Sequence, residues 1–295
     1  NTHLTNMRFE DNSGGALFAS GDYGRGETIR ISGSSFLRNT EQPAFTHVGY
    51  YSPLVIENSL FEANEGAVRA HVSYSSAYIT NSIFKNNAVD NTPSVSLDGG
   101  ASETKAIYNT LFLESGEKRE VAVRLQGTQK NKVFNSVFLG QAGITSVGEI
   151  FELQHSFIDA SMVEGDAFKK GLVYNSEGAG ISLDSEYALA TDSILIDNGA
   201  LADLDLPATD FNGGPRQIGD FIDIGPIESS VATGGVRDDD PKTFETAILV
   251  STVSELRDAL KDTAANGQDD TILLADGVYA IGEDSLGVLE HIDNE

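Results

Sequence analysis

The chain has 295 residues, of which 40% are apolar, so it can bury a substantial core. Asp and Glu total 45 against 19 Lys and Arg, and the net charge of −26 repels phosphate backbones and anionic lipids. The absence of cysteine excludes disulfides, thiol catalysis and cysteine zinc sites. No apolar run approaches the ~20 residues that a membrane helix needs. We therefore expect no nucleic-acid partner and no membrane span.

One phrase, Asn-[Ser/Thr]-aliphatic-Phe, recurs along the first half of the chain. Its four strict copies begin at Asn58, Asn81, Asn109 and Asn135. Looser copies end at Phe9, Phe36 and Phe157, and a weak one covers residues 192–195. The successive phenylalanines are separated by 27, 25, 23, 28, 26 and 19 residues. A repeat of this length indicates a solenoid.

Other positions keep the phase of the phenylalanines. An aliphatic residue stands five positions before most of them, and a second asparagine stands three positions after four of them: Asn12, Asn39, Asn64 and Asn87. Alternating stretches such as 68–72, 95–97 and 123–125 are typical of half-buried strands. Units of this size cannot bury an apolar face alone, but stacked units can. We predict an all-β, right-handed parallel β-helix of about eight or nine coils, with stacked phenylalanines and asparagine ladders at the turns.

These coils resemble right-handed parallel β-helix proteins of the pectin-lyase-like superfamily, especially bacterial secreted and surface members. The segment from Asp210 to Glu228 is similar to the D-x-x-G-x-P-R…D-I-G-x-x-E segment that closes many of those proteins. The resemblance covers residues 1–230 and implies the fold. The superfamily includes lyases, glycosidases and adhesins, so the fold does not decide the function.

We expect three parts: a body over 1–230 with its closing segment at 203–230, a linker over 231–243, and a cap over 244–295. In the cap, a strand at 247–250 and a capping box from Thr252 to Glu255 precede a short helix and a strand near 271–274. This strand–helix–strand pattern resembles the amino-terminal cap of β-helix proteins. In those proteins the cap precedes the coils, whereas here it follows them.

The two ends of the chain read as halves of one coil. Leu289 lies 15 positions before Phe9 across the junction, as Val123 lies 15 before Phe138. We expect head-to-tail assembly or a tandem array; a self-capped monomer and an arbitrary fragment remain alternatives. Because no signal peptide is seen and the first methionine is Met7, we expect a mature or excised segment. The predicted assembly interface comprises Leu4, Phe9, Leu273, Val278, Tyr279, Leu289, His291 and Ile292.

Outward positions of the alternating strand could form a polysaccharide-cleaving face. Arg69 and Arg124 should lie two coils apart with Asp98 between them and His71 nearby. A uronate lyase needs a base and a cation, which these residue types could supply. Charge pairing on a solvated sheet is the simpler interpretation, so no catalytic residue is assigned and the protein leans toward a non-enzyme.

Metal sites have weak support in the sequence. Calcium prefers oxygen-rich loops, and the candidates are Asp203, Asp205, Asp210, Asp238, Asp239 and Asp240. None of them matches an EF-hand loop. His47 and His71 are 24 residues apart and should be neighbours in adjacent coils, more consistent with a surface ladder than with a metal pair.

The sequence thus predicts an extracellular or cell-surface structural protein whose units join end to end into a filament or adhesin. No cofactor is expected, apart from calcium at those aspartates. The partners expected are identical subunits, with polysaccharide as a further one. The alternatives are a lyase or glycosidase and a passive glycan-binding module.

Overall fold

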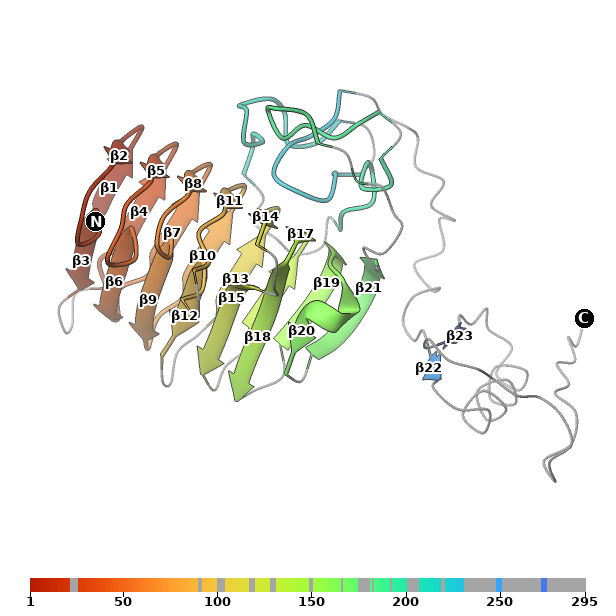
Figure 1. Cartoon of the computed structure of the whole chain (residues 1–295), viewed down its shortest axis with the longest axis horizontal. Coiled ribbons are helices and arrows are strands. Elements are labelled where there is room, and N and C mark those ends of the chain that lie inside the picture. The colour runs from red at the N-terminus through yellow and green to blue at the C-terminus, as the bar shows by residue number, and fades with distance from the viewer. Residues whose placement is uncertain are drawn as a thin grey trace, which may run out of the picture. The chain divides into compact units, whose positions relative to one another are not determined.

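A computed structural model shows a parallel β-solenoid with almost no helix (Figure 1). It divides into two units, residues 1–235 and 236–295. The structure describes residues 1–21, 26–89, 92–99, 104–116, 120–127, 131–148, 151–165, 167–174, 181, 183–191, 193–200, 207–218, 221–230, 248–250 and 272–274.

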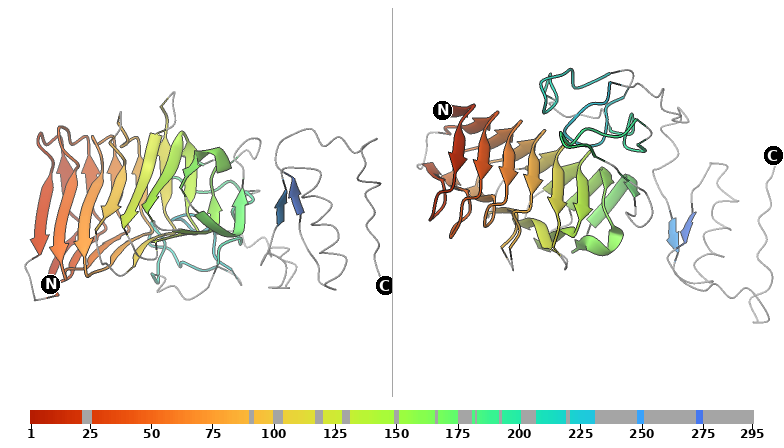
Figure 2. Two further views of the ribbon diagram at one scale, coloured as in Figure 1. Left: turned by 90° about the horizontal axis from the view of Figure 1, so that it is seen from below. Right: turned by 45° about the horizontal axis from the view of Figure 1, so that its top comes forward.

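Three rows of parallel strands wind around the core of the first unit (Figure 2). The first row comprises β1 (Thr2–Thr5), β4 (Ile29–Ser32), β7 (Leu54–Glu57), β10 (Ala77–Thr80), β13 (Lys105–Tyr108), β16 (Asn131–Phe134) and β19 (Phe151–Phe157). The second comprises β2 (Arg8–Glu10), β5 (Ser35–Leu37), β8 (Leu60–Glu62), β11 (Ile83–Lys85), β14 (Leu111–Glu114) and β17 (Val137–Gly140), and it also meets β19. The third comprises β3 (Leu17–Gly21), β6 (Phe45–Tyr50), β9 (Val68–Ser73), β12 (Val95–Asp98), β15 (Glu120–Gly127), β18 (Ala142–Gly148) and β20 (Val163–Glu164). One 3₁₀ turn (Ala160–Met162) precedes β20, and β21 (Ala167–Tyr174) pairs with β19.

The solenoid is shorter than predicted, with about five turns rather than eight or nine. In those turns, from β4 to β18, every strand pairs with a neighbour on both sides. The weak repeat at 192–195 was wrongly expected to form a coil. Its described residues form turns, and Leu195 packs against the outside of the second row.

The phenylalanine ladder is confirmed. The rings of Phe9, Phe36, Phe61, Phe84, Phe112 and Phe138 stack with centroids 4.6–5.0 Å apart. Phe157 does not continue the ladder, because it pairs with Val137, one residue short of Phe138. The period-2 alternation of a strand therefore turns Phe157 outward, and Ile158 enters the core instead.

Both asparagine columns serve the turns as the sequence predicts. Asn58, Asn81, Asn109 and Asn135 adopt left-handed backbone with φ of 45–48°, a conformation that asparagine tolerates better than most residues. The second column is a buried amide ladder. Each Nδ2 donates to the Oδ1 of the following turn, at 2.7 Å from Asn12 to Asn39 and 2.8 Å for the next two steps to Asn64 and Asn87.

The chain returns after β21 to cover one side of the solenoid. Ile83, Leu111, Val137 and Phe157 point outward from the second row and are buried beneath Leu195 and Ile224. Asn81 and Asn135 donate from their side chains to the carbonyls of Thr209 and Ala200, at 2.7 and 3.0 Å. We call the described residues between 181 and 230 the covering segment; it lies over the later turns of the second row (Figure 1).

In the second unit, two short strands are described, β22 (Ile248–Val250) and β23 (Ile272–Leu274). They pair in parallel, as the expected strand–helix–strand pattern requires. The helix expected between them and the linker over 231–243 lie outside the described residues.

Candidate functional site

The first turn forms an open edge, which we define as the side of β1, β2 and β3 that faces away from the second turn. Among the residues that the structure describes, each of these strands has a strand partner on one side only: β4, β5 and β6 respectively. Their backbone hydrogen bonds run toward the second turn, as from the N–H of Asn6 to the carbonyl of Ser32. Strand edges of this kind are templates for pairing with another strand.

Apolar side chains point inward at this edge. Leu4, Phe9 and Leu17 pack against the core but stay partly exposed, whereas Ile31 and Phe36 in the second turn are fully buried. The predicted interface residues Leu4 and Phe9 therefore lie at the end of the core. One further turn would bury them by the same stacking that buries Phe36.

The amide ladder also ends here with an acceptor. Asn12 uses its backbone N–H and its Nδ2 as donors to Asn39 Oδ1, at 3.1 and 2.7 Å. In each later step the Oδ1 of the asparagine accepts both of these bonds from the turn before it. By the same geometry, Asn12 Oδ1 faces the side from which an added turn would donate.

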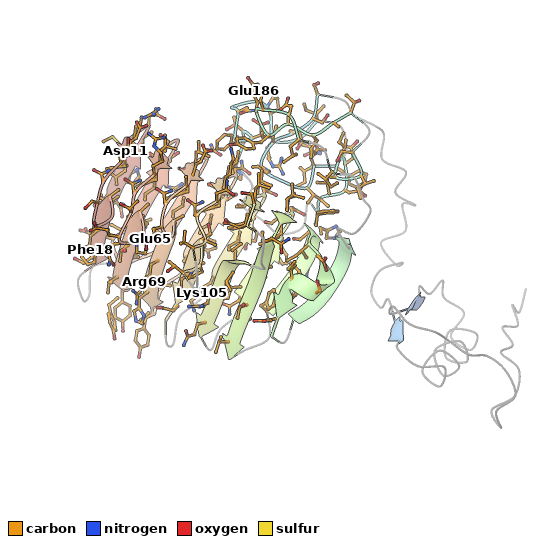
Figure 3. The ribbon with its side chains drawn as sticks, viewed as in Figure 1. Asp11, Phe18, Glu65, Arg69, Lys105 and Glu186 are labelled. Atoms are coloured by element: carbon orange, nitrogen blue, oxygen red, sulfur yellow. The ribbon has the colours of Figure 1, made fainter. Side chains whose placement is uncertain are left out.

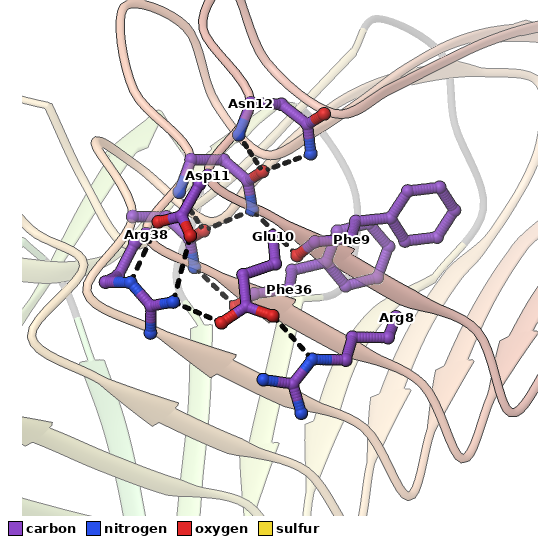
Figure 4. A network of polar contacts seen from close by, with 9 residues as sticks. Arg8, Phe9, Glu10, Asp11, Asn12, Phe36 and Arg38 are labelled. Atoms are coloured by element: carbon purple, nitrogen blue, oxygen red, sulfur yellow. Dashed lines mark hydrogen bonds and ion pairs between the residues drawn. The ribbon is translucent and has the colours of Figure 1, made fainter.

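A network of ion pairs between Arg8, Glu10, Asp11 and Arg38 lies at the outer corner of the edge (Figure 4). Glu10 accepts from Arg8 Nε at 2.7 Å and pairs with Arg38, which also pairs with Asp11 at 2.9 Å. Hydrogen bonds from Arg8 and Arg38 lower the pKa of Glu10 to about 2. These charges lie outside the core, so they do not prevent another turn from packing on the inward apolar positions.

The remaining predicted interface residues belong to the second unit. Leu273 lies in β23, opposite Leu249. Val278, Tyr279, Leu289, His291 and Ile292 lie outside the described residues.

The candidate polysaccharide-cleaving residues do share the outward face of the third row, where Arg69 is labelled in Figure 3. Their order differs from the prediction. Arg69, Ser96 and Arg124 lie side by side on the adjacent strands β9, β12 and β15, so Ser96 rather than Asp98 lies between the two arginines. Asp98 lies two residues further along β12, where it is paired with His71. The arrangement therefore places the carboxylate beside the histidine and not between the two arginines.

The His71–Asp98 pair is a short contact on that face. Asp98 Oδ1 lies 2.5 Å from His71 Nδ1, and Ser73 Oγ lies 3.3 Å from His71 Nε2. The sequence pattern did not single out Ser73, although its spacing of two from His71 on a strand places both side chains on one face.

His47 and His71 do not form the expected surface ladder. His71 aligns with Val48, and His47 aligns with Ala70, so a one-residue offset sends the two rings to opposite faces. His47 is fully buried, with Nε2 3.2 Å from the carbonyl of Ser52. Burial lowers the pKa of His47 below its ordinary value.

Lys105 is a buried cation that the repeat pattern did not reveal. Its Nζ donates to the carbonyl of Gln126 at 2.9 Å. Burial lowers the pKa of Lys105, and the charge of Asp98 opposes that effect. The ammonium group sits close to Gly127, where a Cβ would come within 2.5 Å of it. Lys105 is therefore a structural group at the turn between the third and first rows.

The charged residues of the motif between Asp210 and Glu228 form hydrogen bonds and an ion pair with one another. Arg216, only 3% exposed, pairs with Glu228 at 2.9 Å and donates to the carbonyls of Asp223 and Gly225 at 2.8 Å. Burial raises the pKa of Glu228 to about 7, against the opposing charge of Arg216. The motif thus stabilises the loop in which it lies.

Asp210, one of the calcium candidates, belongs to the same network. Its two carboxylate oxygens accept from the N–H groups of Gly214 and Glu228, at 2.8 and 3.0 Å. Within the part of the chain that the structure describes, no cluster of three or more histidine or acidic side chains could hold a metal ion. Asp203, Asp205, Asp238, Asp239 and Asp240 lie outside the described residues.

A cavity of about 450 Å³ lies between the covering segment and the corner of the early turns. Ser34, Asn58 and Phe211 contribute to its lining, together with Asp210. Because both Asp210 oxygens already accept hydrogen bonds, the groups that remain in the lining are mainly neutral hydroxyls, amides and one aromatic ring.

Comparison with known proteins finds no matching family model and no matching curated protein. Among the described residues, no helix is long and apolar enough to cross a membrane.

Proposed function

We propose that this chain is a structural unit of an extracellular or cell-surface β-solenoid, in which units join head to tail as a filament, an adhesin or a tandem array. The apolar open edge of the first turn carries the proposal. Kinship with the secreted and surface members of the pectin-lyase-like superfamily is part of the same proposal, and it rests on the repeat and on the segment from Asp210 to Glu228.

Addition at the open edge uses the interactions that already hold the turns together. An incoming turn pairs in parallel with β1, β2 and β3 at the strand spacing of about 4.8 Å. It covers Leu4, Phe9 and Leu17, and it donates to Asn12 Oδ1. Many strand edges are protected from added strands by an inward-pointing charged side chain. The inward positions of β1, β2 and β3 carry no such charge.

Residues 287–295 are the segment proposed to supply the incoming strand. The 15-residue step from Val123 to Phe138 joins two inward core residues. The same step leads from Leu289 to Phe9 across a junction between units. Val123 belongs to an inward column that runs back through Val95, Val68 and Phe45 to Leu17, so Leu289 is expected to stack on Leu17.

This contact joins the last residues of one chain to the first turn of the next chain. A heterologous contact that does not close on itself generates a linear assembly. The proposal therefore predicts linear growth rather than a defined dimer.

The test compares two variants of the same turn by sedimentation velocity. Phe9→Glu places a charge at an inward position of the open edge, and it should abolish concentration-dependent association. Phe18→Glu is the matched control, since Phe18 is 66% exposed on β3 and points outward; it should associate like the parent chain. Equal association of both variants, or none in the parent chain, would overturn the proposal.

A further inference from the structure

Three neighbouring side chains on the third row take no part in the proposed assembly contact. Ser73 and His71 lie two residues apart on β9, and Asp98 lies opposite His71 on β12. All three point outward, because side chains two apart on a strand share a face and paired residues lie side by side. The solenoid thus brings a hydroxyl, an imidazole and a carboxylate together from residues 27 or fewer positions apart.

The order of contacts matters chemically. Asp98 Oδ1 lies 2.5 Å from His71 Nδ1, and Ser73 Oγ lies 3.3 Å from the other ring nitrogen, Nε2. With Nδ1–H donated to the carboxylate, Nε2 holds the lone pair that faces the hydroxyl. Serine, histidine and aspartate act in this order when an activated serine attacks a carbonyl, and apo structures often show the first contact longer than in the working complex.

We propose that Ser73 and His71, with Asp98 as the positioning residue, form an acyl-transfer site that hydrolyses a small ester. The Ser73 Oγ–carbonyl bond forms as the hydroxyl proton passes to His71 Nε2. The ester C–O bond then breaks, and the leaving alkoxide takes that proton. Water next attacks the acyl group and gives a proton to His71, and the carboxylic acid leaves as Ser73 recovers its hydrogen.

The surroundings of the three residues define the substrate class. Ser73 is only 4% exposed, which restricts the acyl group to a short one such as acetyl. Arg69 projects from the same face two positions before His71, and Arg124 lies beyond Ser96 at the same level two strands away. These guanidinium groups favour an ester whose remaining part is an anion, in contrast to the acidic chain as a whole.

The first test is hydrolysis of para-nitrophenyl acetate together with covalent labelling by a fluorophosphonate, in which Ser73 would displace fluoride. The full chain should hydrolyse the ester and carry the label on the peptide that contains Ser73. Ser73→Ala and His71→Gln should each lose about 100-fold or more of the hydrolysis rate. Ser96→Ala, an outward serine on the adjacent strand, is the matched control and should retain the rate.

Two further variants separate chemistry from structure. Asp98→Asn should lower the rate, and Asp98→Glu should restore part of it. Arg69→Gln should raise KM for acetoxybenzoate while leaving KM for para-nitrophenyl acetate unchanged. Circular dichroism of each variant confirms the solenoid. Hydrolysis that survives Ser73→Ala, absence of hydrolysis in the folded parent chain, or a label on another residue would overturn the proposal, and none of these outcomes affects the assembly.

Discussion

Asn39, Asn64 and Asn87 can lie inside the solenoid because each amide is almost fully used by its neighbours. Asn64 Oδ1 accepts the backbone N–H and Nδ2 of Asn39, and Asn64 Nδ2 donates to Asn87 Oδ1 and to the carbonyl of Phe36. A buried polar group without a partner is costly, so the ladder holds only where the next turn supplies an acceptor at this position. Glu114 continues the column after Asn87 by accepting its N–H.

Replacing the middle of the ladder should therefore be more damaging than replacing its end. Asn64→Ala leaves several buried groups without partners, and we expect the free energy of unfolding to fall by about 3 kcal/mol or more. Asn12→Ala removes the partly exposed last residue and should cost about 1 kcal/mol. Urea denaturation followed by circular dichroism measures both; equal losses would contradict the cooperative ladder.

His47 makes the stability of the solenoid depend on pH. Burial lowers its pKa in the folded chain, whereas the unfolded residue titrates near 6.5. Between these two values the unfolded state binds more protons than the folded state, so stability falls as the pH drops below about 6.5. We expect the thermal midpoint of the parent chain to decline through this range, and we expect His47→Gln to flatten that part of the curve. An unchanged pH profile in the variant would show that other groups are responsible.

At the scale of the elements, the covering segment depends on one buried ion pair. Arg216→Ala would leave the Glu228 carboxylate without its cationic partner and two carbonyls without their Arg216 donor, and breaking a buried pair from one side costs about 3 to 5 kcal/mol. Arg30→Ala removes the partly exposed pair with Glu57 and should cost about 0 to 1 kcal/mol. Limited proteolysis should then cut the first variant within 181–230, and an uncut segment would contradict this role.

The sequence predicted the repeating elements because each ladder position must keep its residue type. The phenylalanine and asparagine columns could be identified from phase alone. The covering segment could not, although the signal was present: the aliphatic residue of the motif, as in Leu60, Ile83 and Leu111, points outward and needs a cover. In the turn before Leu60, the position equivalent to these aliphatic residues is occupied by the polar Ser35.

The outward site could be predicted only in part, because the exact pairing register of the strands does not follow from the sequence repeat. Alternation placed Arg69, His71, Asp98 and Arg124 on the correct face. The pairing of His71 with Asp98 depends on how long each turn is, and a change of one residue moves a side chain to the opposite face. Turns here vary from 23 to 28 residues between phenylalanines of the ladder, so such offsets cannot be read from spacing alone.

At the scale of the whole molecule, the solenoid has an edge whose inward surface continues the core. The strand edges, the partly exposed Leu4 and Phe9, and the acceptor on Asn12 all face the direction from which another turn would add. The second unit contributes a parallel strand pair of the kind expected in a cap. The proposed assembly by turn addition would account for both features with one contact.

The most direct test is negative-stain electron microscopy of the full chain beside a variant that lacks residues 287–295. The full chain should form continuous thin fibres with an axial repeat of one unit, and the shortened chain should form separate particles. Compact, separate particles from the full chain, or fibres that persist without residues 287–295, would contradict end-to-end assembly through this segment.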